Sequence, residues 1–200
     1  MTIHAYVVEH DFGFAPNPFF RFCSLGCCKP DMRKATKVGD MVAGTGSARV
    51  KRSGYLTFWM KIDEILTFDQ YWDDPRFRRK RPAMRGSAVQ RFGDNIYHRD
   101  PLTGEFVQED SFHSDVGGQI SETDLIADTG KTERVLVGRD FAYYGREGPK
   151  IPGHLSDFVR RRGWRYHYPT EQEEAFLAWF AGFPQRGYLG EPADWQFIEL

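Results

Sequence analysis

The sequence predicts a mixed α+β fold, in which short helices and a C-terminal helix flank a mostly antiparallel β-barrel. Three stretches lead to this prediction. Residues 55–65 form the most strand-like run, because aromatic and β-branched side chains fill it. Residues 38–47 combine a Gly-Asp turn, a short apolar stretch and four small residues, which is typical of a strand approached closely by a neighbour or a flat ligand. Residues 170–183 carry an apolar stripe at helical spacing.

The first third of the chain is expected to alternate strands with one short helix. β-Branched and aromatic residues predict an opening strand at residues 3–9. Pro30 is suited to the first turn of a short helix, since its fixed φ is already helical. The strand at 41–44 is expected to lie beside the strand at 55–65 and to contribute with it to the barrel.

The middle of the chain contains a capped helix and a long polar segment. Thr67 and Gln70 stand three residues apart, as in a capping box, and predict a helix that starts at this point. Residues 76–104 have no regular pattern, and segments of this length within a domain are usually functional or disordered. A further barrel strand is expected at 133–138, with a bulge at Gly138 that lets the sheet continue.

The C-terminal part is predicted to be helical. Residues 155–162 form a plausible helix, and Thr170 with Glu173 forms a second capping pair before the apolar stripe. We therefore divide the chain into a domain at 1–152 and a helical extension at 153–200 packed on the same domain.

Composition limits the possible partners. The chain has 200 residues, 40% of them apolar and 16% aromatic, which is enough to bury a large core. Its net charge of −1 argues against nucleic-acid binding by bulk charge. Arginines nevertheless gather at 76–85, where they form either a solvated loop or an arm that contacts the phosphates of a nucleic-acid backbone through Arg78, Arg79 and Arg81.

The three cysteines do not suggest a disulfide framework. Cys23, Cys27 and Cys28 are odd in number and crowded, and no Cys or His pair elsewhere completes a zinc motif. We interpret them as reduced thiols of a cytoplasmic protein. The N-terminus does not resemble a signal peptide, and no segment reaches the length of a membrane span, so we expect no membrane partner.

Candidate ligand-binding residues lie in two small-residue or aromatic stretches. The loop 11–20 holds four phenylalanines and either packs on the core or forms an aromatic wall beside a pocket, with Phe14 and Asn17 as candidates. Thr45 and Ser47 belong to the small-residue run, where a flat ligand can approach the backbone.

Two polar clusters are the candidate chemical groups. The first, at 108–114, contains Asp110, Ser111 and His113, of which His113 and Asp110 suit acid–base catalysis. Its alternative is a polar loop that caps neighbouring backbone. The second contains side chains suited to a nucleobase edge or face: Asp94, Asn95, Tyr97 and His98.

Several kinds of site lack their motif. The carboxylates and imidazoles of these clusters have no diagnostic metal spacing, so we predict no metal site. Gly44-Thr45-Gly46-Ser47 lacks the Gly-Lys-Ser/Thr end of a phosphate loop and the dinucleotide-binding fingerprint, and no Gly-x-Ser-x-Gly elbow is present. The sequence indicates no particular cofactor.

Over residues 3–152, the chain resembles the family called nucleotide modification associated domain, second type. The resemblance is carried by blocks at 8–19, 27–30, 38–47, 66–72, 93–98, 108–114 and 141–145. It implies a setting in bacterial or phage DNA base modification, without implying a reaction or catalytic residues. Gly39-Asp40-Met41-Val42 and the strand after Tyr55 are also similar to the EVE and ASCH domains, which implies a PUA-like barrel.

Three functions follow from these observations. The first is a module that binds a nucleotide or a modified base in DNA within an aromatic-lined pocket. The second is an enzyme that modifies a nucleotide or DNA base, with His113 and Asp110 as acid and base. The third is a regulatory subunit that contacts other DNA-modification proteins.

Overall fold

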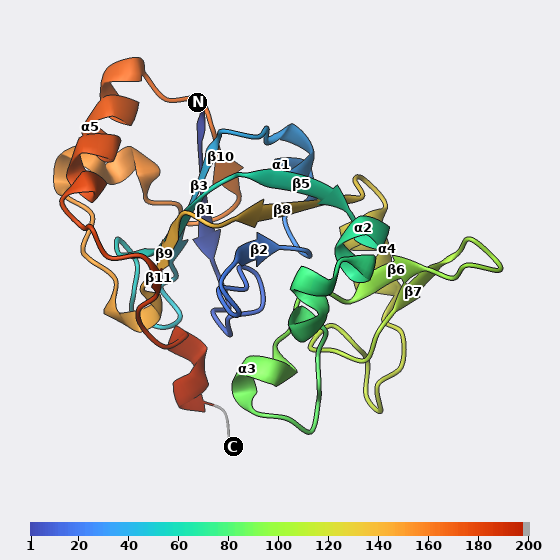
Figure 1. The fold of residues 1–200 in the computed structure, drawn as a ribbon. Coiled ribbons are helices and arrows are strands. Elements are labelled where there is room, and N and C mark those ends of the chain that lie inside the picture. The colour runs from blue at the N-terminus through green and yellow to red at the C-terminus, as the bar shows by residue number, and fades with distance from the viewer. Residues whose placement is uncertain (198–200) are drawn as a thin grey trace. The chain divides into compact units, whose positions relative to one another are not determined.

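In the computed structural model, which describes residues 1–197, the chain divides into two units interleaved in sequence (Figure 1). The first unit comprises Met1–Phe12, Lys37–Asp63 and the described residues from Gly138 onward. The second comprises Gly13–Thr36 and Glu64–Val137. Each unit combines strands with short helices, which confirms the predicted mixed α+β class. The last three residues of the predicted C-terminal extension lie outside the described part.

The first unit is built on one six-stranded sheet. Its strands follow the order β10 (Trp164–Arg165), β1 (Ile3–Val8), β3 (Met41–Gly46), β4 (Leu56–Lys61), β9 (Phe141–Tyr143) and β11 (Gly187–Tyr188). β1 runs parallel to β3, and β9 runs parallel to β11, whereas the remaining neighbours are antiparallel.

The small-residue run of β3 allows its neighbours to approach closely. A Cβ atom placed on Gly44 would lie 2.2 Å from the ring of Phe58 on β4 and 2.6 Å from the side chain of Val8 on β1. The pairing of β3 with β4 also shifts register between Gly44 and Thr45. Close strand packing, one of the two expected uses of this stretch, therefore accounts for the glycine.

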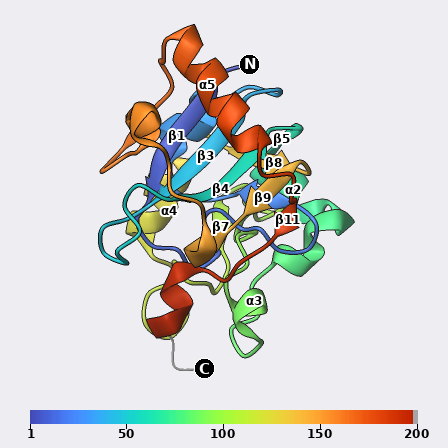
Figure 2. The ribbon, with the colours of Figure 1, turned by 90° about the vertical axis from the view of Figure 1, so that its left-hand side faces the viewer.

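Helix α5 (Thr170–Ala181) covers one face of this sheet, as Figure 2 shows. Phe176 and Phe180 are buried in the same core cluster as Trp59 of β4. The helix begins at Thr170 with Pro169 at the N-cap, so the prediction that Thr170 caps it was wrong by one residue. Short 3-10 helices lie before and after it: η2 (Gly145–Glu147), η3 (Gly153–Phe158) and η4 (Ala193–Phe197).

The second unit contains two smaller sheets and most of the short helices. Its three-stranded sheet has the order β2 (Cys23–Leu25), β8 (Arg134–Gly138) and β5 (Glu64–Thr67), and β6 (Tyr97–Arg99) pairs with β7 (Phe106–Gln108). The helices are α1 (Pro30–Ala35), α2 (Phe68–Asp73), η1 (Pro75–Lys80), α3 (Ala88–Arg91) and α4 (Glu122–Thr129).

Local signals in this unit predicted helix starts correctly. Pro30 occupies the first turn of α1, as expected. The capping box of α2 is formed, because Thr67 Oγ1 accepts the N–H of Gln70 at 3.1 Å and Gln70 Oε1 accepts the N–H of Thr67 at 2.9 Å. The polar segment 76–104 is more regular than its composition suggested, since it contains η1, α3 and β6.

The predicted PUA-like barrel is not confirmed. In the six-stranded sheet of the described residues, β10 and β11 stand at opposite ends of the strand order, so the sheet is open. The expected strand at 55–65 is two strands, and β4 and β5 belong to different sheets. The expected bulge at Gly138 is also wrong, because β8 ends there and β9 continues in another sheet. Periodicity reports which residues are extended but not where a run changes sheets.

No helix within residues 1–197 is both long enough and apolar enough to cross a membrane.

Candidate active site

Cys28 lies in a tight turn between β2 and α1 of the second unit. Cys28 and Lys29 both have left-handed backbone conformations, with φ values of 60° and 46°. Such conformations are unfavourable for residues other than glycine and persist where the surroundings hold them. Here the N–H of Cys28 donates to Asp128 Oδ1 at 2.6 Å, and the N–H of Gly26 donates to Asp94 Oδ2 at 3.1 Å. Two buried carboxylates thus hold the turn that presents Cys28.

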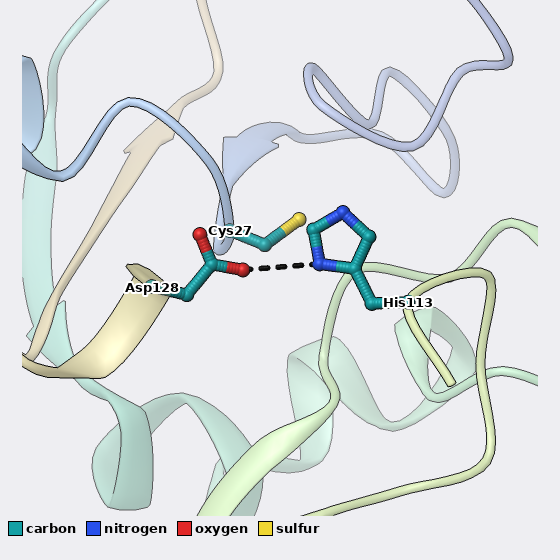
Figure 3. A group of neighbouring side chains, drawn as sticks. All are labelled: Cys27, His113 and Asp128. Atoms are coloured by element: carbon teal, nitrogen blue, oxygen red, sulfur yellow. Dashed lines mark hydrogen bonds and ion pairs between the residues drawn. The ribbon is translucent and has the colours of Figure 1, made fainter. Parts of the chain in front are cut away.

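Cys28, His113 and Asp128 form a thiol–imidazole–carboxylate chain. The Sγ atom of Cys28 lies 3.7 Å from Nε2 of His113, and Nδ1 of the same ring lies 3.1 Å from Oδ2 of Asp128. Figure 3 shows the His113 ring beside the Asp128 carboxylate, and the sulfur of Cys27 points toward the ring. This order of groups is the arrangement in which an imidazole activates a nucleophile and a carboxylate orients the imidazole.

The electrostatics of the chain favour a thiolate on Cys28. A hydrogen bond with the Cys27 thiol lowers the pKa of Cys28, burial opposes that effect, and the bond with His113 reinforces it, so that the pKa is about 6. Burial works to lower the pKa of His113, but its bonds to Asp128 and Cys28 outweigh burial and raise the pKa to about 10. Burial keeps the pKa of Cys27 well above its ordinary value. The lowered pKa of Cys28 and the raised pKa of His113 both favour a thiolate beside an imidazolium.

Asp128 is held by more than the imidazole. It lies near the C-terminal end of α4, and only 3% of its surface is exposed. Its Oδ2 atom also accepts the hydroxyl of Tyr97 at 2.9 Å, and Gln108 Nε2 lies 3.3 Å from that hydroxyl. Several donors around one carboxylate fix its orientation.

Arg33 brings a buried positive charge to the same region. Its guanidinium donates to three backbone carbonyls, those of Cys28 at 2.8 Å, Asp128 at 2.6 Å and Arg134 at 2.6 Å. Burial lowers the pKa of Arg33, and the negative charge of Asp128 opposes that effect. Arg33 thereby ties the thiol turn to the end of α4 and stabilises negative charge at both.

Aromatic side chains of the Phe-rich loop contact the imidazole. The ring of Phe14 meets the His113 ring edge-on, with their centroids 4.7 Å apart, and it also contacts Phe112 at 5.6 Å. Phe14 is buried, whereas Phe112 is 42% exposed. The loop thus packs on the second unit and supplies an apolar wall to the imidazole.

The same groups include a set of atoms that could ligate a metal. One donor atom each from Cys27, His113 and Asp128 falls within 4.8 Å of the others. Thiolate, imidazole and carboxylate are the ligands that zinc accepts. However, the Asp128 oxygens already accept bonds from Cys28, Tyr97 and His113, and the buried cation Arg33 lies nearby. The donor set therefore fits a hydrogen-bonded chain of side chains better than a metal centre.

Some predicted residues do meet at this chain. His113, Tyr97 and Phe14 lie within it or contact it directly. Ser111 supports His113 from its own turn, because its hydroxyl accepts the N–H of His113 at 3.3 Å. The carboxylate bonded to His113 is Asp128, not the Asp110 proposed as its partner from the sequence.

Asp110 instead lines an open cleft of about 540 Å³ in the second unit. The cleft is also lined by Trp72, Arg81 and Glu109. His98 stacks on Trp72 with centroids 4.1 Å apart, and its Nε2 atom lies 2.9 Å from a Glu109 oxygen. The loop that follows β7 therefore carries Asp110 to the cleft and His113 to the thiol–imidazole–carboxylate chain.

The buried side-chain amides of Asn17 and Asn95 donate hydrogen bonds to backbone carbonyls. Asn17 Nδ2 donates to the carbonyls of Gly13 and Phe92, at 3.1 and 2.8 Å, and Asn95 Nδ2 donates to the carbonyl of Tyr71 at 2.9 Å. Such bonds hold loops together. Asp94 has the same kind of role at Gly26.

The remaining predicted residues lie elsewhere. Thr45 and Ser47 belong to the first unit, where their hydroxyls lie 3.3 and 3.1 Å from the carbonyls of Tyr6 and Glu9. In the basic run, Arg78 and Arg79 are exposed, and Arg79 lies over Phe20. Arg81 covers the ring of Trp72 at 3.5 Å in the cleft.

The sequence prediction missed Cys28 and Asp128. Cys28 was grouped with its neighbours as an ordinary reduced thiol, and 85 residues separate it from His113. A usable signal was a cysteine two residues before a helix-starting proline, in a chain that also contains His and Asp. Asp128 had no local signal.

The fold and this chain of groups define a mixed α+β protein in which a thiol, an imidazole and a carboxylate lie together. The chain belongs to the family described as Nucleotide modification associated domain 2, whose family model matches residues 1–199. That description associates the protein with nucleotide modification, and the match extends beyond the blocks recognised in the sequence. No curated protein and no solved structure matches the chain.

Proposed function

We propose that this protein is a cysteine-dependent enzyme of nucleotide modification, in which Cys28 attacks an electrophilic carbon of a nucleotide or DNA base. The observation that carries the proposal is the continuous chain from the Cys28 sulfur through His113 to Asp128. In this proposal Cys28 is the nucleophile, His113 is the acid and Asp128 orients the imidazole. Asp128 thus takes the place of Asp110, which the sequence suggested as the partner of His113.

Each group has a definite part in the proposed step. The Cys28 thiolate forms a carbon–sulfur bond, and the carbon releases an exocyclic substituent, which departs with the bonding electron pair. His113 gives the proton on Nε2 to this leaving group, while the hydrogen bond to Asp128 keeps the other proton on Nδ1. Water then attacks the same carbon and gives a proton to His113, and the carbon–sulfur bond breaks, so that the hydroxylated product leaves and the Cys28 thiolate is restored.

The open cleft of the second unit supports a nucleotide as the substrate. Arg81 and Arg85 offer charges to a phosphate, and Asp110 offers an acceptor to a base amino group, while the Trp72 ring holds the Arg81 guanidinium in place. The loop after β7 reaches both the cleft and the chain, so a ligand held by Asp110 would contact the segment that positions His113.

The test measures product and covalent adduct together. The parent protein and the variants Cys28→Ser, His113→Ala and Cys23→Ser are incubated with nucleotides and with plain and modified DNA. We expect a new nucleoside mass, or an adduct on the Cys28 peptide, in the parent and in Cys23→Ser, because buried Cys23 is separate from the chain. The Cys28→Ser variant should form neither the product nor the adduct, and the rate of their formation should fall roughly 100-fold or more in His113→Ala. Product that persists in Cys28→Ser contradicts the proposal.

A second candidate, favoured by the arginine-lined cleft, is a module that only binds a nucleotide or modified base. In that case no product forms, Cys28→Ser binds normally, and His113→Ala costs roughly 1–3 kcal/mol of binding. Replacing Arg78, Arg79 and Arg81 by Ala should then weaken DNA binding and flatten its salt dependence, since phosphate contacts release counterions.

A further inference from the structure

The first unit contains a separate cavity lined by arginines. It has a volume of about 340 Å³ and is lined by Val7, Ala48, Ser53, Arg160 and Arg161. Val7 belongs to β1, and the two arginines follow η3. All five residues belong to the first unit, so this cavity is distinct from the thiol chain of the second.

The wall that carries the arginines is anchored to the sheet. The N–H of Arg160 donates to Thr45 Oγ1 of β3 at 3.2 Å, and the side-chain Nε of Arg160 is buried. Within residues 1–197 this Nε has no hydrogen-bond partner. Buried donors are nearly always satisfied in proteins, so an unpaired one beside a cavity suggests a missing acceptor.

The cavity also lacks a balancing negative charge. Its described lining contains no carboxylate. Other arginines of this unit form ion pairs, such as Arg165 with Asp157 at 3.5 Å and Arg186 with Asp140 at 2.8 Å. In contrast, the described part of the chain provides no ion pair for Arg160 or Arg161.

The chemistry of the lining suits a phosphate ester. Guanidinium groups bind phosphate through parallel N–H bonds, and a serine hydroxyl at the rim can add one more. The volume falls within the range of small-ligand sites.

We infer that the cavity between Ser53, Arg160 and Arg161 binds a phosphate group of a nucleotide or a nucleic-acid strand. This site is independent of the proposed thiol chemistry. It gives the first unit a role in holding the polyanionic part of a ligand.

The test compares the lining arginines with a matched neighbour. Binding of thymidine monophosphate, inorganic phosphate and a fluorescein-labelled single-stranded oligonucleotide is measured for the parent, for Arg160→Ala/Arg161→Ala, for Arg161→Gln and for Arg162→Ala. Arg162 is exposed, follows directly in the chain and does not line the cavity. We expect the double variant to bind roughly tenfold more weakly or worse, Arg161→Gln to be weakened in the same direction, and Arg162→Ala to bind like the parent.

The ligands distinguish the two sources of phosphate. Displacement of the oligonucleotide by the free mononucleotide would show that a single phosphate ester fills the site, and a strand that resists displacement would show that neighbouring phosphates contribute. Either result supports the site if it depends on Arg160 and Arg161. A folded parent that binds none of the three probes overturns the inference, as does an equal loss in Arg162→Ala. If the double variant does not fold, Arg161→Gln alone decides. Cys28→Ser should bind phosphate normally, so failure of the thiol proposal leaves this result unaffected.

Discussion

Oδ1 of Asp128 accepts the backbone N–H of Cys28 at 2.6 Å. The other oxygen of the same carboxylate faces the His113 imidazole at 3.1 Å. One side chain thus sets both the backbone of the nucleophile turn and the orientation of the ring that activates the sulfur. Changes at Asp128 should therefore affect the reactivity of Cys28 although the two side chains are joined only through His113.

Replacing Asp128 by Asn should slow alkylation of Cys28. The neutral amide stabilises the His113 imidazolium less, so the thiolate loses part of its partner. The rate of iodoacetamide modification at pH 7, measured by mass spectrometry of the Cys28 peptide, should fall roughly 10- to 100-fold, the usual effect of groups that orient an active residue. Asp110→Asn is the control and should react like the parent. Equal slowing in both variants would show that Asp128 has no special role.

The alkylation of Cys28 should depend on pH as a thiol with a pKa of about 6 rather than its ordinary 9.0. Because this acid has a lowered pKa, its thiolate exists above about pH 6 and is lost as the pH falls through that value. The rate should therefore rise through pH 6 and stay level at neutral pH. Burial raises the pKa of Cys23, which should remain unmodified in the folded protein. If the rate of Cys28 alkylation still rises between pH 8 and 9, Cys28 does not form an ion pair with His113.

Turnover, once a substrate is found, should follow a bell-shaped pH profile. His113 has a raised pKa of about 10, so its imidazolium exists below that value and is lost as the pH rises through it. Thiolate and imidazolium coexist between about pH 6 and about pH 10. The limbs of kcat/KM against pH should fall near these two values. A profile with only the acidic limb would mean that His113 does not donate the proton.

Replacing Arg33 by Met should destabilise the second unit. Three buried carbonyls would lose their donor, and unsatisfied buried groups cost about 1–3 kcal/mol each. We expect the free energy of unfolding in urea to fall by at least about 3 kcal/mol. Lys34→Met is the matched control, because Lys34 is exposed on the same helix, and it should stay within about 0.5 kcal/mol of the parent. A small effect at Arg33 would mean that water replaces its bonds.

Lys80 and Asp94 should be coupled in stability. Both are buried, and the charge of Lys80 opposes the burial that raises the pKa of Asp94. Lys80→Met removes the nearby positive charge and also the donor to the carbonyl and Oδ1 of Asn17, so it should cost about 3–5 kcal/mol of unfolding free energy. The double variant Lys80→Met/Asp94→Asn should recover part of this loss. Strictly additive losses in a urea double-mutant cycle would show that the two charges do not interact.

Local patterns of the sequence determined much of the secondary structure. The capping box at Thr67 and the proline at the start of α1 act within a few residues, so the sequence alone places them. Strand β1 and the start of α5 at Thr170 were likewise expected to within a residue or two. The membership of the chain in its family was also readable, because several short blocks recur together.

Only the tertiary structure decided which groups act together. His113 was recognised as a chemical group, but packing selected Asp128 as its carboxylate and carried Asp110 to a different surface. The same is true of Cys28, whose turn is defined by bonds to Asp128, 100 residues later in the chain. Residue type and periodicity describe the local backbone and the face that a side chain occupies. They do not specify which distant side chain shares that face, since this depends on how the strands and helices pack.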